Sequence, residues 1–154
     1  MPFIENVAAA DIPTRFHHDA GENSMLIQIM DTATKWWPTP KHNFKETHRF
    51  EFLDVERNDI VSDEVMKISD EQAEQIVKLL QHALEKRMNV VVHCFAGICR
   101  SGAVCEVGVM MGFQDTERFR QPNLLVKHKM MKVLGWTYDE DEKSDPNSWR
   151  NQLY

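Results

Sequence analysis

Short apolar runs, each bounded by polar or turn-forming residues, predict three β-strands. Residues 25–30 (Met-Leu-Ile-Gln-Ile-Met) and 89–92 (Asn-Val-Val-Val) are almost continuously apolar, which is typical of strands buried on both faces of a sheet. Residues 49–55 (Arg-Phe-Glu-Phe-Leu-Asp-Val) alternate between polar and apolar positions, as expected for a strand with two different faces. The pattern predicts no strand in the first twenty-odd residues.

Three segments have the spacing or the composition of helices. Ser69 and Gln72 form a capping-box start for a helix from about residue 70 to residue 87. Residues 101–111 are apolar nearly all round, with Glu106 as the one charge, which predicts a helix in the middle of the domain. A third helix is expected from about residue 124 to residue 134, with Asn123 as a candidate N-cap. One face of the first helix carries its apolar residues, namely Ala73, Ile76, Val77, Leu80, Ala83 and Leu84.

The alternation of strands and helices predicts an α/β fold with a central, mainly parallel sheet flanked by helices. Residues 1–138 are long enough for one domain with its own core. Residues 139–154 are rich in acidic side chains and lack periodicity, so we expect a mobile C-terminal tail.

The chemistry of the chain is concentrated in the segment between the predicted strand at 89–92 and the helix at 101–111. Cys94 and Arg100 enclose five residues, namely Phe95, Ala96, Gly97, Ile98 and Cys99. A loop that joins a strand to a helix N-terminus directs several backbone N–H groups at one point, where the helix dipole favours an anion. Thiols ionise more readily in such surroundings, and the planar guanidinium of Arg100 matches two phosphoryl oxygens. We therefore expect a site for a tetrahedral oxyanion, with Cys94 as the nucleophile.

The stretch His93-Cys94-Phe95-Ala96-Gly97-Ile98-Cys99-Arg100-Ser101 resembles the His-Cys-x-x-Gly-x-x-Arg-Ser/Thr signature of the cysteine-based protein tyrosine and dual-specificity phosphatases. Every fixed position of that signature is met. The resemblance implies a compact phosphatase catalytic domain over residues 1–138, in which Cys94 becomes a phosphocysteine and Arg100 clamps the phosphoryl group. Ser101 is expected to cap the helix and to donate a hydrogen bond to the thiolate. His93 is expected to orient the loop rather than to act as a base.

The resemblance also implies an aspartate on a separate loop that protonates the leaving oxygen, and three residues qualify by their order in the chain. Asp54 is favoured because it directly closes the predicted strand at 49–55, where a rigid element would aim it. Asp59 and Asp63 remain open, because their separation from Cys94 is closer to that of typical relatives.

Composition and charge narrow the choice of substrate and partner. The chain has 154 residues and a formal net charge of −6, which weighs against nucleic acid and acidic membranes as partners. No apolar run is long enough to span a bilayer, and three cysteines suit a reducing compartment, so a cytoplasmic location is expected. We also expect the protein to be a monomer. We expect no cofactor, and the histidines, scattered along the chain, predict no metal site.

The expected substrate is a phosphorylated protein, with phosphotyrosine first and phosphoserine or phosphothreonine as further candidates. Phosphate, sulfate and vanadate should bind in the loop as inhibitors. Alternatives are a phosphate ester outside proteins (an RNA 5′ end or an inositol phosphate), a phosphoprotein-binding module without activity, and an arsenate reductase or sulfur-transfer protein. For the last class Cys99 or Cys105 would have to act as a redox partner of Cys94.

Overall fold

The computed structural model describes residues 1–55 and 67–136 of the chain. Its centre is a five-stranded sheet in the order β3-β2-β4-β1-β5, in which every pair of neighbouring strands is parallel. The expected α/β class with a mainly parallel central sheet is confirmed. The strands are β1 (Phe3–Ala8), β2 (Ser24–Met30), β3 (Glu46–Glu51), β4 (Asn89–Cys94) and β5 (Gln114–Asp115).

All three expected helices are present, as α1 (Asp70–Lys86), α2 (Arg100–Met111) and α3 (Leu124–Val133). The capping box of α1 is formed, because the Ser69 side chain accepts the Gln72 backbone N–H while the Gln72 side chain accepts the Ser69 N–H. Asn123 caps α3 by accepting the Val126 N–H. Two short 3₁₀ turns, η1 (Ala9–Asp11) and η2 (His18–Ala20), lie between β1 and β2.

The strands differ from the sequence-based expectation in two respects. The strand expected at 49–55 is β3, which begins at Glu46 and ends at Glu51, so Asp54 follows the strand by three residues instead of closing it. The pattern also missed two strands, the two-residue β5 at one edge of the sheet and β1, which lies between β4 and β5. The six residues of β1 mix Glu5 and Asn6 with apolar neighbours, and so short a mixed run has no clear period of two.

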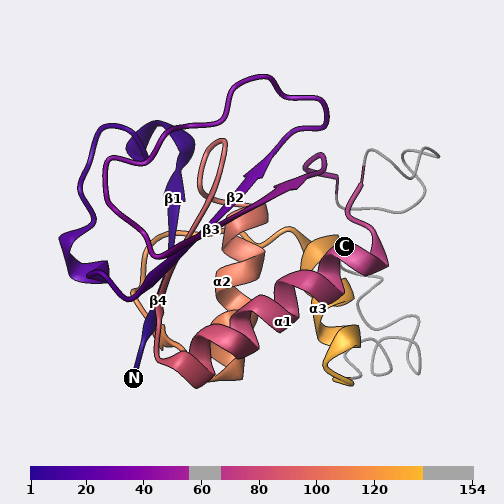
Figure 1. Cartoon of the computed structure of the whole chain (residues 1–154). Helices are drawn as coiled ribbons and strands as arrows, with labels where there is room; N and C mark the ends of the chain where they lie inside the picture. Colours follow the sequence, from indigo (N-terminus) through magenta and orange to yellow (C-terminus); the bar gives the residue numbers. More distant parts are fainter. Residues whose placement is uncertain (56–66, 137–154) are drawn as a thin grey trace.

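The core has two parts, one on each face of the sheet. The larger part joins the sheet to the three helices, which lie together on one face (Figure 1). The smaller part is covered by connecting segments instead of helices, and it contains Val7, Ile12, Ala20, Leu26 and Val91. Because β2 and β4 are covered on both faces, all seven residues of β2 are buried, as its continuous apolar sequence predicted.

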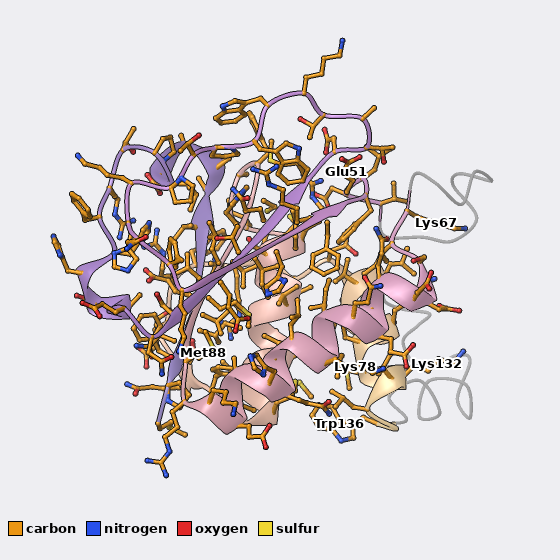
Figure 2. The ribbon with its side chains drawn as sticks, viewed as in Figure 1. Glu51, Lys67, Lys78, Met88, Lys132 and Trp136 are labelled. Atoms are coloured by element: carbon orange, nitrogen blue, oxygen red, sulfur yellow. The ribbon has the colours of Figure 1, made fainter. Side chains whose placement is uncertain are left out.

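Since all the strands run in the same direction, their carboxyl ends share one edge of the sheet. Figure 2 marks the two opposite edges, with Glu51 at the end of β3 and Met88 just before the start of β4. The carboxyl edge is where open α/β sheets place their ligands. Within the two described ranges, no helix is long and apolar enough to cross a membrane.

Candidate active site

The segment that joins β4 to α2 leaves the carboxyl edge of the sheet and turns tightly over the end of β1. At the turn Gly97 has φ +78°, and a Cβ added there would lie 2.4 Å from the carbonyl carbon of Val7. Only glycine combines this left-handed backbone with so close an approach to another strand. The turn thus fixes the residue type at position 97.

Neighbouring segments donate hydrogen bonds to the backbone carbonyls of the loop from Cys94 to Arg100. The Ala9 N–H donates to the Phe95 carbonyl (3.1 Å), and Nδ2 of Asn6 donates to the Gly97 carbonyl (2.7 Å). Residues 121 and 123 continue the pattern, donating their N–H groups to the carbonyls of residues 98 and 99 (3.1 and 2.9 Å). Because four of its carbonyls point outward, the loop can direct its backbone N–H groups inward, as in a backbone nest that binds an anion.

Cys94 ends β4 with its side chain buried (2% exposed) at the first turn of α2. Its Sγ lies 3.2 Å from Oγ of Ser101, and the Ser101 backbone N–H points at the same sulfur from 3.5 Å. The Ser101 hydroxyl and backbone N–H can therefore both donate hydrogen bonds to the sulfur at the N-terminus of α2. Ser101 is thus next to the thiol, as expected. It does not cap the helix as expected, because α2 begins at Arg100 and its N-cap residue is Cys99.

His93 and Cys105 are buried beside the loop, and neither is placed to take part in proton transfer. Burial lowers the pKa of His93 to about 4, so its ring is neutral near pH 7. Its Nδ1 lies 3.4 Å from the Cys94 carbonyl oxygen, consistent with an orienting role. Burial raises the pKa of the Cys105 thiol above its ordinary value, which keeps that thiol protonated and unreactive.

Arg100, the first residue of α2, is also buried (5% exposed). Its Nη1 donates to Oδ1 of Asp31 (2.7 Å) and to the backbone carbonyl of Phe52 (2.8 Å). Sequence analysis missed both partners. The signal for Asp31 was present, because it follows the strand predicted at 25–30, but only the strand order places β2 beside β4.

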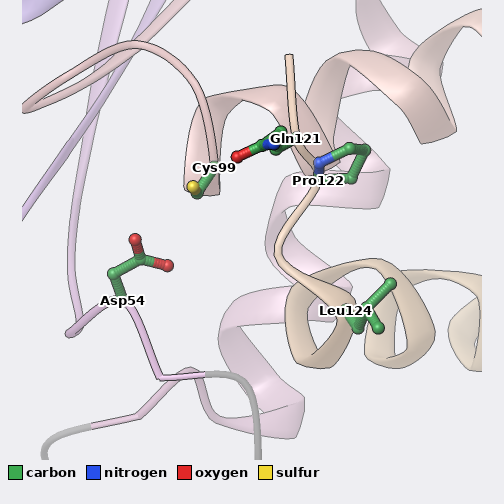
Figure 3. Close-up of a pocket in the computed structure, with 5 residues that line it drawn as sticks. All are labelled: Asp54, Cys99, Gln121, Pro122 and Leu124. Carbon is green, nitrogen blue, oxygen red and sulfur yellow. The ribbon is translucent and has the colours of Figure 1, made fainter. Parts of the chain in front are cut away.

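Asp54, the favoured general acid, reaches the same edge of the sheet from the segment after β3. Its Oδ1 accepts a 2.6 Å hydrogen bond from Nδ2 of the buried Asn123, which also caps α3. Figure 3 shows the Asp54 carboxylate facing Cys99 across an open pocket of about 480 Å³. The remaining lining residues are Gln121, Pro122 and Leu124. Asp59 and Asp63 lie outside the described residues.

The other loop residues differ in their exposure to solvent. Phe95 is exposed (67%) and Ala96 is exposed beside it, whereas Ile98 is half-buried. Among the described residues no group of three or more histidine, cysteine or carboxylate side chains could hold a metal ion. The chemistry available at this edge is therefore that of a thiol, a guanidinium, a hydroxyl, carboxylates and backbone amides.

Comparison with known proteins places the fold. No family model and no curated protein sequence matches the chain. Among solved structures, human DUSP28 aligns over 94% of this chain and 96% of its own, with a TM-score of 0.58 and 15% identity. A mouse protein assigned as a dual-specificity phosphatase, solved with zinc tungstate, aligns over 83% of this chain and 76% of its own, with a TM-score of 0.50 and 16% identity. The chain thus has the compact fold of the dual-specificity branch of the cysteine-based protein phosphatases, as the resemblance of its Cys94–Arg100 loop implied.

Proposed function

We propose that the protein is a phosphatase that hydrolyses phosphate monoesters on protein side chains, phosphotyrosine foremost, through a phosphocysteine intermediate. The observation that carries this proposal is the position of the Cys94 sulfur, at the N-terminus of α2 and inside a loop whose carbonyls are bonded outward. A tetrahedral phosphoryl group in that loop would meet backbone N–H groups and the Arg100 guanidinium. These groups neutralise the charge of the equatorial oxygens, which is the main requirement of phosphoryl transfer.

In the first step, Sγ of Cys94 forms a bond to phosphorus while the bond from phosphorus to the ester oxygen breaks. That oxygen leaves with a proton from Asp54, which faces the pocket beside the loop. In the second step, Asp54 takes a proton from water, the water oxygen attacks phosphorus, and the P–S bond breaks. Ser101, 3.2 Å from the sulfur, then donates a hydrogen bond that eases the departure of the thiolate. Inorganic phosphate is the product.

The charges around the loop favour a protein substrate over a polyanion. The five residues between Cys94 and Arg100 carry no charge, and two carboxylates, Asp31 and Asp54, lie at the rim. An inositol polyphosphate or an RNA 5′ end would bring further negative charge close to these carboxylates, and like charges repel. A single phosphate on a protein side chain avoids that repulsion.

The proposal is tested with p-nitrophenyl phosphate and the purified wild type, Cys94→Ser and Cys105→Ala. We expect the wild type to turn over and vanadate to inhibit it. Cys94→Ser should lose essentially all activity, since serine at this position lacks an ionised nucleophile. Cys105→Ala removes a buried thiol of α2 that burial keeps protonated, so it should retain activity within about threefold.

Two outcomes would contradict the proposal. Turnover that survives Cys94→Ser would remove the thiol mechanism. Binding of phosphopeptides without any hydrolysis by the wild type would identify a phosphoprotein-binding module. Assays on phosphotyrosine, phosphoserine and phosphothreonine peptides, with an inositol phosphate and an RNA 5′-phosphate alongside, then rank the substrate classes.

A further inference from the structure

The guanidinium of Arg100 is oriented by hydrogen bonds to the protein framework. Both hydrogen bonds to that framework use one nitrogen, Nη1, which donates to the Asp31 carboxylate and to the Phe52 carbonyl. Among the described residues, Nε of Arg100 is buried and has no hydrogen-bond partner. One edge of the guanidinium is therefore held by protein, while Nε, on the other edge, has no hydrogen-bond partner among the described residues.

A guanidinium can bind two oxygens of a phosphoryl group only through an edge whose N–H groups have no partner in the protein. Arginine binds an oxyanion most strongly when two parallel N–H groups meet two oxygens. With Nη1 committed to the framework, the fork that remains consists of Nε–H and an N–H of Nη2. The contacts of Asp31 and Phe52 thus decide which edge of the guanidinium faces the substrate.

We propose that Asp31 is a positioning residue that fixes Arg100 for phosphoryl binding; this inference rests on the function proposed above. The side chain of Arg100 is 6% exposed and that of Asp31 is 62% exposed. The contact therefore joins a carboxylate at the protein surface to a guanidinium that is buried. Arginine has many rotamers to lose on binding, and holding it beforehand lowers that loss when the substrate arrives.

The backbone around Asp31 is itself fixed. Directly after β2 the Thr34 N–H donates to the Asp31 carbonyl (3.1 Å), and the Ala33 N–H donates to Oε1 of Glu51 (3.0 Å). Ala33 has φ +65°, a conformation that non-glycine residues adopt rarely. This turn ties the end of β2 to the end of β3, so the carboxylate of Asp31 is presented from a defined position.

The same contact could be interpreted as competition, with the carboxylate occupying the place of a phosphoryl oxygen. The geometry argues for positioning. Asp31 bonds the nitrogen that also binds the Phe52 carbonyl, and a backbone carbonyl of the framework does not leave when a substrate binds. The nitrogen without a partner, Nε, is not the one that Asp31 occupies.

The test compares Asp31→Ala, Asp31→Asn and the control Glu85→Gln by kcat and KM for p-nitrophenyl phosphate and by vanadate inhibition. Asp31→Ala should lower kcat/KM roughly 10- to 100-fold, the scale of a misplaced binding group, and should weaken vanadate inhibition. Asp31→Asn keeps an oxygen acceptor for Nη1, so it should recover most of that loss. Glu85→Gln removes an exposed charge near the end of α1, at the opposite edge of the sheet, so it should resemble the wild type.

A double-mutant cycle with Arg100→Lys separates positioning from a general effect on the fold. A lysine ammonium has no edge to orient, so Asp31→Ala should cause little further loss in that background. Thermal unfolding of each variant checks folding, and Asp31→Ser supplies a second variant without the carboxylate.

Tighter vanadate inhibition in Asp31→Ala would mean that Asp31 competes with the substrate. Unchanged kinetics in Asp31→Ala, or an equal loss in the Arg100→Lys background, would also overturn the inference. A wild type without hydrolysis would instead refute the proposed function, which keeps the two failures distinct.

Discussion

Each side chain of the candidate site is held by a partner from a different part of the chain. The Cys94 thiol contacts Ser101 of α2, Arg100 contacts Asp31 after β2, and Asp54 contacts Asn123 before α3. Since a misplacement of about 1 Å can cost 10²-fold in rate, these partners matter as much as the residues that they hold. Asn123 serves twice, because its Nδ2 holds Asp54 while its Oδ1 caps α3.

The role of Asp54 as general acid is tested by Asp54→Asn. Asparagine keeps an oxygen for the Asn123 contact but has no proton to give to the leaving oxygen. We expect turnover of a phosphotyrosine peptide, which has a poor leaving group, to fall by roughly 10²–10⁴-fold. Turnover of p-nitrophenyl phosphate should fall much less, because its leaving group departs without a proton. Steady-state rates on both substrates measure the difference.

Glu51→Gln is the control for Asp54→Asn, since it changes another carboxylate near the end of β3. Near-normal turnover of the phosphopeptide by Asp54→Asn would reject Asp54 and would move the role to Asp59 or Asp63. The same two assays are then run on Asp59→Asn and Asp63→Asn. The variant that has lost the general acid should lose turnover of the phosphopeptide far more than turnover of p-nitrophenyl phosphate.

At the scale of elements, the Cys94–Arg100 loop is held between β1 and the segment before α3. Asn6 of β1 joins the two, because its Nδ2 donates to the Gly97 carbonyl (2.7 Å) and to the Phe119 carbonyl (3.0 Å). The side chain is buried (2% exposed). A strand without any catalytic residue therefore shapes the loop that carries the chemistry.

Asn6→Ala should lower both stability and activity. The two carbonyls lose their donor inside the protein, which costs about 1–3 kcal/mol of unfolding free energy. The loop loses a tether, so kcat/KM for p-nitrophenyl phosphate should fall by roughly tenfold. Urea unfolding and steady-state kinetics measure the two effects.

Asn89→Ala is the matched control for Asn6→Ala. Asn89 also bridges two backbone groups, the Phe3 N–H and the Ala20 carbonyl, but at the first residue of β4, away from the loop. It should lower stability to a similar degree and leave kcat/KM near that of the wild type. Equal activity in both variants would show that the loop keeps its shape without Asn6.

At the scale of the whole molecule, stability depends on pH through buried histidines. Among the described residues, burial is the chief cause that lowers the pKa of His93, to about 4, and the pKa of His17. Between pH 6.5 and 4 the unfolded chain binds a proton at position 93 that the folded protein does not bind. Stability therefore falls as the pH falls through this window, by up to roughly 3 kcal/mol for His93.

The pH dependence is measured by urea unfolding at pH 7, 6 and 5, above the range in which carboxylates begin to titrate. Both ring nitrogens of His17 are buried without a partner among the described residues, so phenylalanine can replace the ring. His17→Phe should reduce the loss of stability between pH 7 and pH 5 without abolishing it, because His93 remains. The exposed neighbour His18, replaced by phenylalanine, is the control. If the unfolding free energy of His17→Phe changed with pH as steeply as that of the wild type, His17 would not contribute to the pH dependence.

The elements with strong local signals were predictable from the sequence. The capping box at Ser69, the apolar run at 25–30 and the helical face of α1 are all read from neighbouring residues, and each was confirmed. β1 was missed because its six residues have no clear alternation. The end of β3 was misplaced by four residues, because Phe52 still donates its N–H to Met30 beyond the regular strand and its sequence continues the alternation.

By itself, the sequence determined the unit that carries the chemistry: a buried strand, a loop bounded by Cys94 and Arg100, and an apolar helix. Their spacing is covalent, so no tertiary contact is needed to bring the thiol and the guanidinium into one turn. Only the tertiary structure decided what surrounds them, namely Asp31, Asn6 and the pairing of Asp54 with Asn123. These contacts join residues far apart in the chain, and they exist because parallel strands in the order β3-β2-β4-β1-β5 end at a common edge.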